Sequence, residues 1–168
     1  MGSAITAIRE KLQRYPNLKV EQSEKYIRVL PSESGGFPVT LFERQEGATT
    51  VYYADWHEDF DREEEAHALN CFAMGLSDFA RLKVASAGDV DYKWTLETRQ
   101  GDKWISHGMV GLLFFPFWRR RRDRYLQNRI ITESFSECSA CGNVYSGANP
   151  QEADSAYRRH ALEAHDKR

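Results

Sequence analysis

Two cysteines and two histidines near the end of the sequence have the residue types and the spacing of a metal site. Cys138 and Cys141 are separated by two residues, eighteen residues lie between Cys141 and His160, and four lie between His160 and His165. Thiolate and imidazole groups are preferred ligands of Zn²⁺, which takes four of them in tetrahedral structural sites. The spacing therefore predicts one zinc ion bound by Cys138, Cys141, His160 and His165.

The residues between the two pairs favour a helix that carries both histidines. Asn149 can cap this helix, Pro150 suits its first position and Glu152 its third. A site with four protein ligands has no open position for a substrate, so we expect the zinc to be structural. A segment of this size buries too little apolar surface to fold alone, and zinc can contribute about 10 kcal/mol to its folding.

The segment from residue 138 to residue 165 resembles the two-Cys, two-His ββα zinc finger. In that family three residues separate the second cysteine from an aromatic residue, and two residues separate an apolar residue from the first histidine. Tyr145 and Tyr157 occupy these positions here. The resemblance implies a zinc-finger-like module over residues 134–168. Its loop is longer than usual, because the family has about 12 residues between the second cysteine and the first histidine, and this chain has eighteen.

Other roles for the two cysteines fit the sequence less well. A thioredoxin-like redox pair needs Cys141 in the first turn of a helix, but Gly142 and Asn143 follow it. A c-type haem site needs a histidine at position 142. The remaining alternative is that the four residues share no ion. Residues 134–168 contain four basic and five acidic side chains, which favours a structural or protein-facing finger over one that binds DNA.

The strongest local charge lies just ahead of this module. It consists of six basic side chains with a single acidic one, Asp123, among them, and Trp118 and Tyr125 flank it. The basic residues are Arg119, Arg120, Arg121, Arg122, Arg124 and Arg129. Such a run can bind phosphates while the aromatic rings stack on bases, or it can dock on anionic lipid. The alternative is a solvated connector over residues 119–129, partly neutralised by an acidic cluster: Asp55, Glu58, Asp59, Asp61, Glu63, Glu64 and Glu65.

The acidic cluster also raises the weaker hypothesis of a hydrolytic enzyme. His57, Glu58 and Asp59 are adjacent, and His67 follows, so a metal-assisted site requires these groups to converge in space. The same charges are typical of a helix N-terminus, where acidic side chains oppose the helix dipole. Cys71 has no identifiable partner base, and we interpret it as a small core residue.

Hydrophobic periodicity predicts the elements that must position these groups. We expect helices over residues 4–14 and across the stripe formed by Leu69, Phe72, Leu76 and Phe79. Strands are predicted over residues 26–30, 39–43, 50–56, 92–99, 103–108 and 111–118. His107 falls in the hairpin that Gly101 turns, where a partly exposed sheet position accounts for it. The order of helix, three strands, helix, and two to three strands predicts an α+β fold with a mainly antiparallel sheet.

Length and composition agree with a globular α+β protein. The 168 residues are 41% hydrophobic and carry a net charge of −2, which gives no overall attraction to nucleic acid. The longest apolar run is ten residues and contains Pro116, so no membrane span is predicted. The N-terminal residues lack the features of a secretory signal, and three cysteines are too few for a disulfide scaffold. We therefore expect a cytoplasmic protein.

Together these patterns predict a globular domain over residues 1–130, with the arginine run as its connector to a zinc-finger-like module over residues 134–168. The function that they favour is a zinc-binding, non-enzymatic adaptor whose partner is another protein. The chief alternative is a nucleic-acid-binding protein that uses Arg119, Arg120, Arg121 and Arg122 together with the finger.

Overall fold

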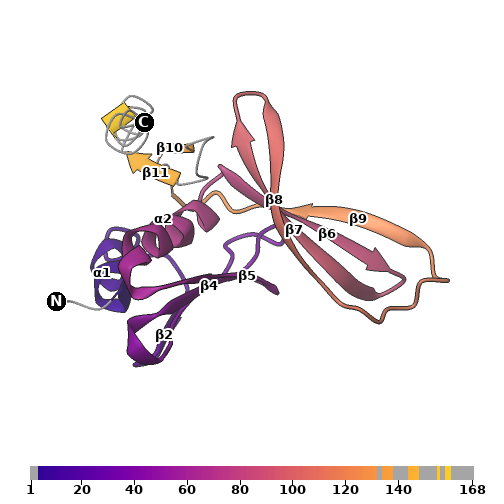
Figure 1. Cartoon of the computed structure of the whole chain (residues 1–168), viewed down its shortest axis with the longest axis horizontal. Helices are drawn as coiled ribbons and strands as arrows, with labels where there is room; N and C mark the ends of the chain where they lie inside the picture. The colour runs from indigo at the N-terminus through magenta and orange to yellow at the C-terminus, as the bar shows by residue number, and fades with distance from the viewer. Residues whose placement is uncertain (1–3, 132–133, 138–143, 148–154, 156–157, 160–168) are drawn as a thin grey trace, which may run out of the picture.

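The computed structural model describes residues 4–131, 134–137, 144–147, 155, 158 and 159. Within them the chain is α+β, with two helices and two larger antiparallel sheets (Figure 1). A separate two-stranded pair is formed by β10 (Ser134–Glu137) and β11 (Val144–Gly147). The predicted fold class is therefore confirmed at the level of helices packed on antiparallel sheets.

The first sheet is an antiparallel meander of five strands in sequence order. Its strands are β1 (Val20–Gln22), β2 (Tyr26–Val29), β3 (Val39–Glu43), β4 (Thr49–Tyr53) and β5 (Trp56–Phe60). The sequence predicted three strands here. The segment expected as one strand over residues 50–56 turns at Ala54, which has a φ of 51°, and the chain returns as β5. The acidic residues expected at a helix start thus lie partly in an edge strand.

Both helices cover one face of the first sheet (Figure 1). Helix α1 (Ala4–Leu12) ends two residues before the predicted limit, and α2 (Glu65–Gly75) follows a short 3-10 turn, η2 (Arg62–Glu64). The Glu64 carboxylate accepts a hydrogen bond from the Asp61 backbone N–H at 3.0 Å, which satisfies a donor at the helix start. No helix in the described residues is long and apolar enough to cross a membrane.

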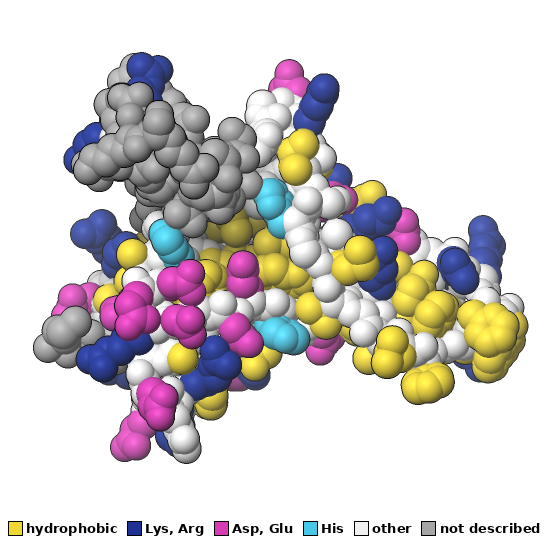
Figure 2. All heavy atoms as spheres, viewed as in Figure 1, with side chains coloured by type: hydrophobic (Ala, Val, Ile, Leu, Met, Phe, Trp, Pro, Cys, Tyr) yellow, Lys and Arg dark blue, Asp and Glu magenta, His cyan; other side chains and the backbone are white. Residues whose placement is uncertain are grey.

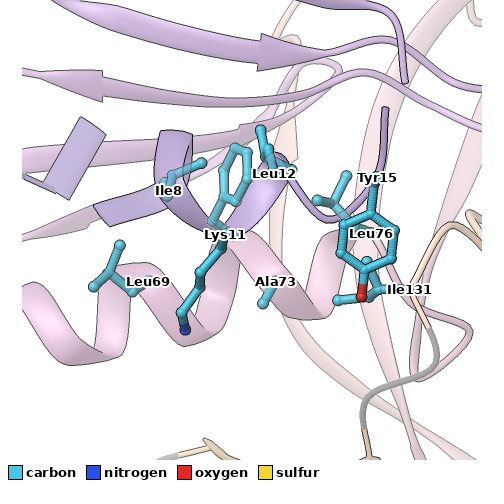
Figure 3. Close-up of a pocket in the computed structure, with 9 residues that line it drawn as sticks. Ile8, Lys11, Leu12, Tyr15, Leu69, Ala73, Leu76 and Ile131 are labelled. Carbon is cyan, nitrogen blue, oxygen red and sulfur yellow. The ribbon is translucent and has the colours of Figure 1, made fainter. Parts of the chain in front are cut away.

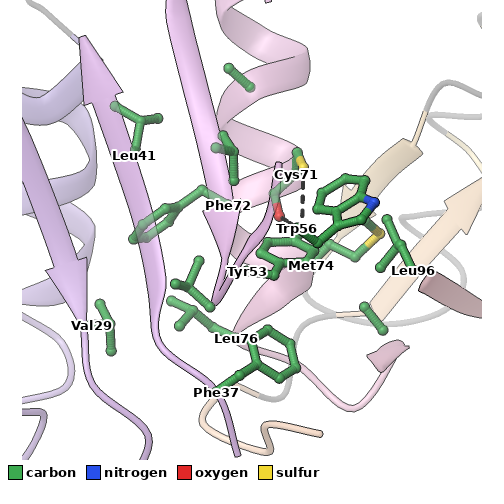
Figure 4. Packing of buried hydrophobic residues seen from close by; sticks show 14 of the residues in the cluster. Val29, Phe37, Leu41, Tyr53, Trp56, Cys71, Phe72, Met74, Leu76 and Leu96 are labelled. Carbon is green, nitrogen blue, oxygen red and sulfur yellow. Dashed lines mark hydrogen bonds between the residues drawn. The ribbon is translucent and has the colours of Figure 1, made fainter. Parts of the chain in front are cut away.

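The core lies between α2 and the first sheet, and one tyrosine crosses it. The Tyr53 hydroxyl donates to the backbone carbonyl of Cys71, and its ring lies so close to Gly75 that a Cβ there would be 2.3 Å from a ring carbon (Figure 4). Cys71 is 6% exposed, as predicted for a core residue, and burial raises the pKa of its thiol. That thiol stays protonated and unreactive at neutral pH.

The second sheet forms an arm, residues 80–126, that extends away from the helices (Figure 1). Its strands run in the order β8-β7-β6-β9 and are β6 (Ala80–Ala87), β7 (Val90–Gln100), β8 (Lys103–Gly111) and β9 (Arg121–Leu126). The predicted strand is confirmed as β7, and Trp94 and Leu96 are buried as expected. Its alternation is only partial, because Glu97 on the opposite face is also buried, where it pairs with Arg81. Leu96 packs beside Trp56 of the first sheet, so the base of the arm shares the core (Figure 4).

The structure differs from the sequence prediction at the far end of the arm. Residues 112–120, which we call the tip loop, were expected to be mostly strand, but the strand β8 ends at Gly111. The arginine run was expected to be a connector, yet Arg121–Leu126 form β9 and pair with β6 along its length. Proline has no N–H to donate to a sheet, and Pro116 lies within the segment that fails to form a strand.

The buried side chain of Asn128 joins the arm to the body. Its amide nitrogen donates to the carbonyls of Gly75 (2.8 Å) and Phe37 (2.9 Å). Its amide oxygen accepts from the Phe37 N–H at 3.2 Å. Asn128 is 3% exposed and directly follows Gln127, the first residue after β9. One side chain therefore connects the end of α2, the segment before β3 and the return strand of the arm.

We predict that Asn128→Ala lowers the free energy of unfolding by about 2–4 kcal/mol, because it leaves several buried backbone groups without partners. The measurement is urea denaturation followed by circular dichroism. Gln127→Ala is the control. That side chain makes one exposed hydrogen bond, to the Asp78 carbonyl, and its loss should cost about 1 kcal/mol or less. Equal losses for the two variants would show that Asn128 has no special role.

Candidate interaction surface

The four predicted zinc ligands, Cys138, Cys141, His160 and His165, lie outside the described residues. The structure does describe the strands on either side of the two cysteines. In the antiparallel pair β10–β11 the last register pair is Glu137 with Val144, so residues 138–143 connect the two strands. Residues 155, 158 and 159, ahead of the two histidines, are helical.

The residues of the enzyme hypothesis do not converge. His57, Glu58 and Asp59 are successive residues of β5, so their side chains alternate between the two faces of the sheet. Glu58 is paired with the buried Val51 on the helix-covered face, where partial burial and then repulsion from Glu64 raise its pKa. Among the described residues, no group of three or more histidine, cysteine or acidic side chains is placed to hold a metal ion.

On the other face of β5, His57 and Asp59 have structural partners. The His57 ring lies against Tyr52, with 5.6 Å between ring centroids. The Asp59 carboxylate accepts a hydrogen bond from the Thr50 hydroxyl at 2.6 Å and pairs with Arg44 at 3.6 Å. These contacts hold a solvent-facing sheet surface together, and nothing in the geometry sets up acid–base chemistry.

The acidic cluster does not neutralise the arginine run. Its only ion pair within the described part of the chain is that of Asp59 with Arg44, which belongs to the same sheet region. On the face that Figure 2 shows, acidic side chains gather over the body, whereas apolar and basic side chains dominate the end of the arm. The two charged regions therefore act on their surroundings separately.

Two of the charges in β9 are used inside the arm. Arg124 donates to both carboxylate oxygens of Asp91, at 2.6 and 2.5 Å, and to the Ser86 hydroxyl at 3.0 Å. These hydrogen bonds lower the pKa of the Asp91 carboxyl. Asp123 pairs with Lys83 at 3.0 Å. Both pairs link β9 to the β6–β7 hairpin, so they stabilise the arm and leave little charge for a partner.

Arg119, Arg120, Arg121 and Arg122 are exposed and form no ion pair with any residue that the structure describes. The side chain of Arg119 lies over Gly88 in the β6–β7 turn, where a Cβ would be 2.7 Å from its Cδ. The Arg121 guanidinium lies 5.8 Å from the centre of the Phe115 ring. These contacts orient the side chains but leave four guanidinium charges without a carboxylate.

The tip loop is attached to the rest of the arm by one stacked aromatic ring and by two backbone hydrogen bonds. Phe115 stacks on Tyr92 of β7, with ring centroids 3.9 Å apart and an interplanar angle of 7°. The Leu112 N–H donates to the Tyr92 carbonyl at 2.8 Å, and the Gly88 N–H donates to the Arg120 carbonyl at 3.0 Å. The loop is therefore held at both ends and near its centre.

The remaining large side chains of the tip loop point into solvent. Leu113 and Phe114 are each 92% exposed, Trp118 is 75% exposed and Phe117 is 69% exposed. Phe117 meets the edge of Trp118 at a centroid distance of 5.2 Å. Residues 113–118 line an open hollow of about 540 Å³. Contiguous exposed apolar surfaces are typical of interaction sites in proteins.

The sequence predicts the arginines as part of a candidate surface but the tip residues as a strand. Two features of the sequence point to the structure that forms. The apolar residues from Leu112 to Phe115 do not alternate with polar ones, and Pro116 interrupts the run. A buried strand can also lack alternation, so the same run was compatible with the strand predicted over residues 111–118, and that prediction is wrong.

The arm itself is stiffened by an arginine between two aromatic rings. The Arg81 guanidinium of β6 lies 4.2 Å from the centres of the Trp104 and Tyr125 rings and pairs with Glu97 at 2.6 Å. These four residues come from all four strands of the arm. Cation–π contacts on both faces of one guanidinium fix the sheet surface across its width, so Tyr125 is less free to stack on a base than the sequence indicated.

A small groove between α1 and α2 is the other hollow of interest (Figure 3). Apolar side chains line it, with Leu12 and Tyr15 on one side and Leu69 and Ala73 on the other, and Lys11 reaches across its mouth. Its volume of about 40 Å³ has room for one or two water molecules only. This groove is too small for a ligand.

Comparison with known proteins does not place the chain in a family. No protein-family model matches the chain, and no curated protein or solved structure matches it. The features of the chain that bear on function are therefore the surface chemistry of the arm and the cysteine and histidine spacing.

Proposed function

We propose that the protein is a non-enzymatic binding protein whose contact surface is the end of the arm, formed by the tip loop and Arg119 to Arg122. The zinc-finger-like module at residues 134–168 is a structural unit of the same chain. The proposal combines the predicted adaptor function with a specific surface. The observation that carries it is the exposure of four large apolar side chains beside four unpaired arginines.

The energetics of the tip loop favour a binding function. Burying a leucine or phenylalanine side chain contributes about 1.5–3 kcal/mol of hydrophobic stabilisation. Leu113, Phe114 and Phe117 are exposed and do not contribute it to the fold. The loop nevertheless has a defined attachment through Phe115 and Tyr92. A partner that covers the exposed side chains recovers the missing hydrophobic stabilisation, and the guanidinium groups favour a partner with negative charge.

The zinc proposal is supported by the strand pair around the two cysteines. Glu137 and Val144 are register partners in this pair, so the sequence places Cys138 and Cys141 between two paired strands, with the two-residue spacing of zinc-finger ligands. Cys138 and Cys141 would supply thiolates, and His160 and His165 imidazoles. A reducing compartment such as the cytoplasm would keep both cysteines available for the ion. When bound, zinc would stabilise the fold of the module and perform no chemistry on a substrate.

We expect one zinc ion per chain in protein purified without chelator, measured by inductively coupled plasma mass spectrometry. Cys138→Ser should lose most of this zinc, because the substitution removes one of the four ligands and the remaining three bind zinc much more weakly. Cys71→Ser is the matched control, since Cys71 is buried in the core and the variant should keep its zinc. Zinc absent from reduced wild-type protein, or retained in full by Cys138→Ser, would refute the proposed site.

Nucleic acid is the second candidate partner, and the four unpaired arginines favour it. Aromatic side chains beside basic ones can bind single strands by stacking and charge. At this surface, however, Phe115 is stacked on Tyr92, and Arg81 lies over one face of the Tyr125 ring. Two more of the exposed apolar side chains, Leu112 and Leu113, are leucines and cannot stack on a base. The stacking surface is therefore smaller than the sequence indicated.

The contact surface can be tested with a photo-crosslinking residue. With benzoylphenylalanine in place of Phe114, irradiation of living cells should give adducts, because this side chain would be covered by the partner. The control carries the same residue in place of Val20, which is exposed on the edge strand β1. Mass spectrometry identifies the adduct as lipid, protein or nucleic acid. Adducts from position 20 but not from position 114 would refute the arm as the contact surface.

A further inference from the structure

The end of the arm exposes several large apolar side chains that are close in sequence. Leu113 and Phe114 are both 92% exposed, and Phe117 and Trp118, which follow Pro116, are 69% and 75% exposed. Residues 113–118 contain no polar side chain. The hot spots of protein–protein interfaces are a few residues that fill well-packed pockets, whereas a fluid hydrocarbon layer can surround a run of exposed apolar side chains without a matching pocket.

The end of the arm and the rest of the molecule carry net charges of opposite sign. Residues 83–93 and 111–125, at the end of the arm, contain seven basic and three acidic side chains, a net charge of +4. The whole chain has a net charge of −2, so the rest of the molecule carries −6. Near a negatively charged surface this division turns the arm toward the surface and the body away from it.

The unpaired arginines lie at the depth that such an orientation requires. Arg119 and Arg120 end the tip loop, and Arg121 and Arg122 are the first residues of β9. The four arginines directly follow Trp118 in the sequence. Because a strand rises about 3.3 Å per residue, each of them lies a short distance along the chain from the apolar side chains. Amphipathic segments that lie at a membrane interface bury their apolar side about 5–10 Å deep, with basic residues beside the headgroups.

We infer that the end of the arm docks on an anionic lipid bilayer. Leu113, Phe114, Phe117 and Trp118 enter the boundary between headgroups and acyl chains, and Arg119 to Arg122 contact the lipid phosphates. This inference rests on the proposed function, since it names the partner of the same surface. The rigid attachment of the loop through Phe115 holds these side chains ready, so little ordering is needed on binding.

The test uses the full-length protein and sedimentation with vesicles of phosphatidylcholine, with and without 30% phosphatidylserine. Wild-type protein should bind the anionic vesicles and bind neutral ones weakly. Replacing both apex residues, Leu113→Ser with Phe114→Ser, should weaken this binding at least tenfold. The control, Val20→Ser with Ile105→Ser, removes two exposed apolar side chains outside the tip loop and should bind as the wild type does.

The arginines are tested in the same assay. Converting Arg119, Arg120, Arg121 and Arg122 to Gln should weaken binding about a hundredfold and remove most of its salt dependence. The charge-matched control changes four exposed basic residues elsewhere to Gln: Arg14, Lys19, Lys25 and Lys103. Circular dichroism on every variant confirms that it is folded.

Insertion is distinguished from surface adsorption by brominated lipids, which quench tryptophan fluorescence only at the depth of the bromine. The quenching should be present in the wild type and lost in Trp118→Phe, because the other three tryptophans lie outside the tip loop. Three results would overturn the inference: no binding to anionic vesicles, binding that the tip variant leaves unchanged, or binding without quenching of Trp118.

These outcomes can be separated from failure of the proposed function. If vesicles are not bound but the crosslinker at position 114 forms adducts with protein or nucleic acid, the lipid inference is wrong and the arm remains the contact surface. A fluorescein-labelled single-stranded oligonucleotide, bound by the wild type and not by the arginine variant, would identify nucleic acid as the partner instead. If position 114 forms no adducts of any class while position 20 does, the proposed function fails as well.

Discussion

The hydrogen bonds of the buried Asn128 amide are the constraint on which the placement of the arm depends. The arm leaves the body after α2 and returns through β9, so two segments must be held close together at its base. Asn128 contacts Gly75 at the first of these and lies within the second, and it also binds Phe37 ahead of β3. A buried amide with three satisfied hydrogen bonds specifies one geometry, because any shift leaves polar groups unpaired.

Beyond this junction the arm changes character along its length. Near the body, Leu82 and Leu96 belong to the hydrophobic core. Farther along, ion pairs within the sheet, such as those of Arg124 with Asp91 and of Asp123 with Lys83, use charges of β9. At the far end, Leu113 and Phe114 are 92% exposed, and Arg119 to Arg122 form no ion pair within the described part of the chain. A stiff stem with an unsatisfied end is an arrangement suited to presenting a surface at a distance from the body.

The sequence predicted the elements whose patterns are local and failed where tertiary context decides. Helix α1 and strand β3 follow from periodicity, and the β7–β8 hairpin from alternation and Gly101. The turn between β4 and β5 contains no glycine, proline or asparagine, and Asp55 is its only residue typical of turns, so the sequence separated the two strands weakly. The arginine run became a strand because β6 offers it a free edge, with Asp91 as a partner for Arg124. That contact spans 33 residues, and a local pattern cannot predict it.

Amide hydrogen exchange, measured with and without phosphatidylserine vesicles, would locate the contact surface most directly. Docking through the end of the arm predicts slower exchange in residues 112–122 when vesicles are present, and unchanged exchange in the first sheet and in α2. Slower exchange confined to the body, or no change anywhere in the chain, would contradict the assignment of the arm as the contact surface for lipid.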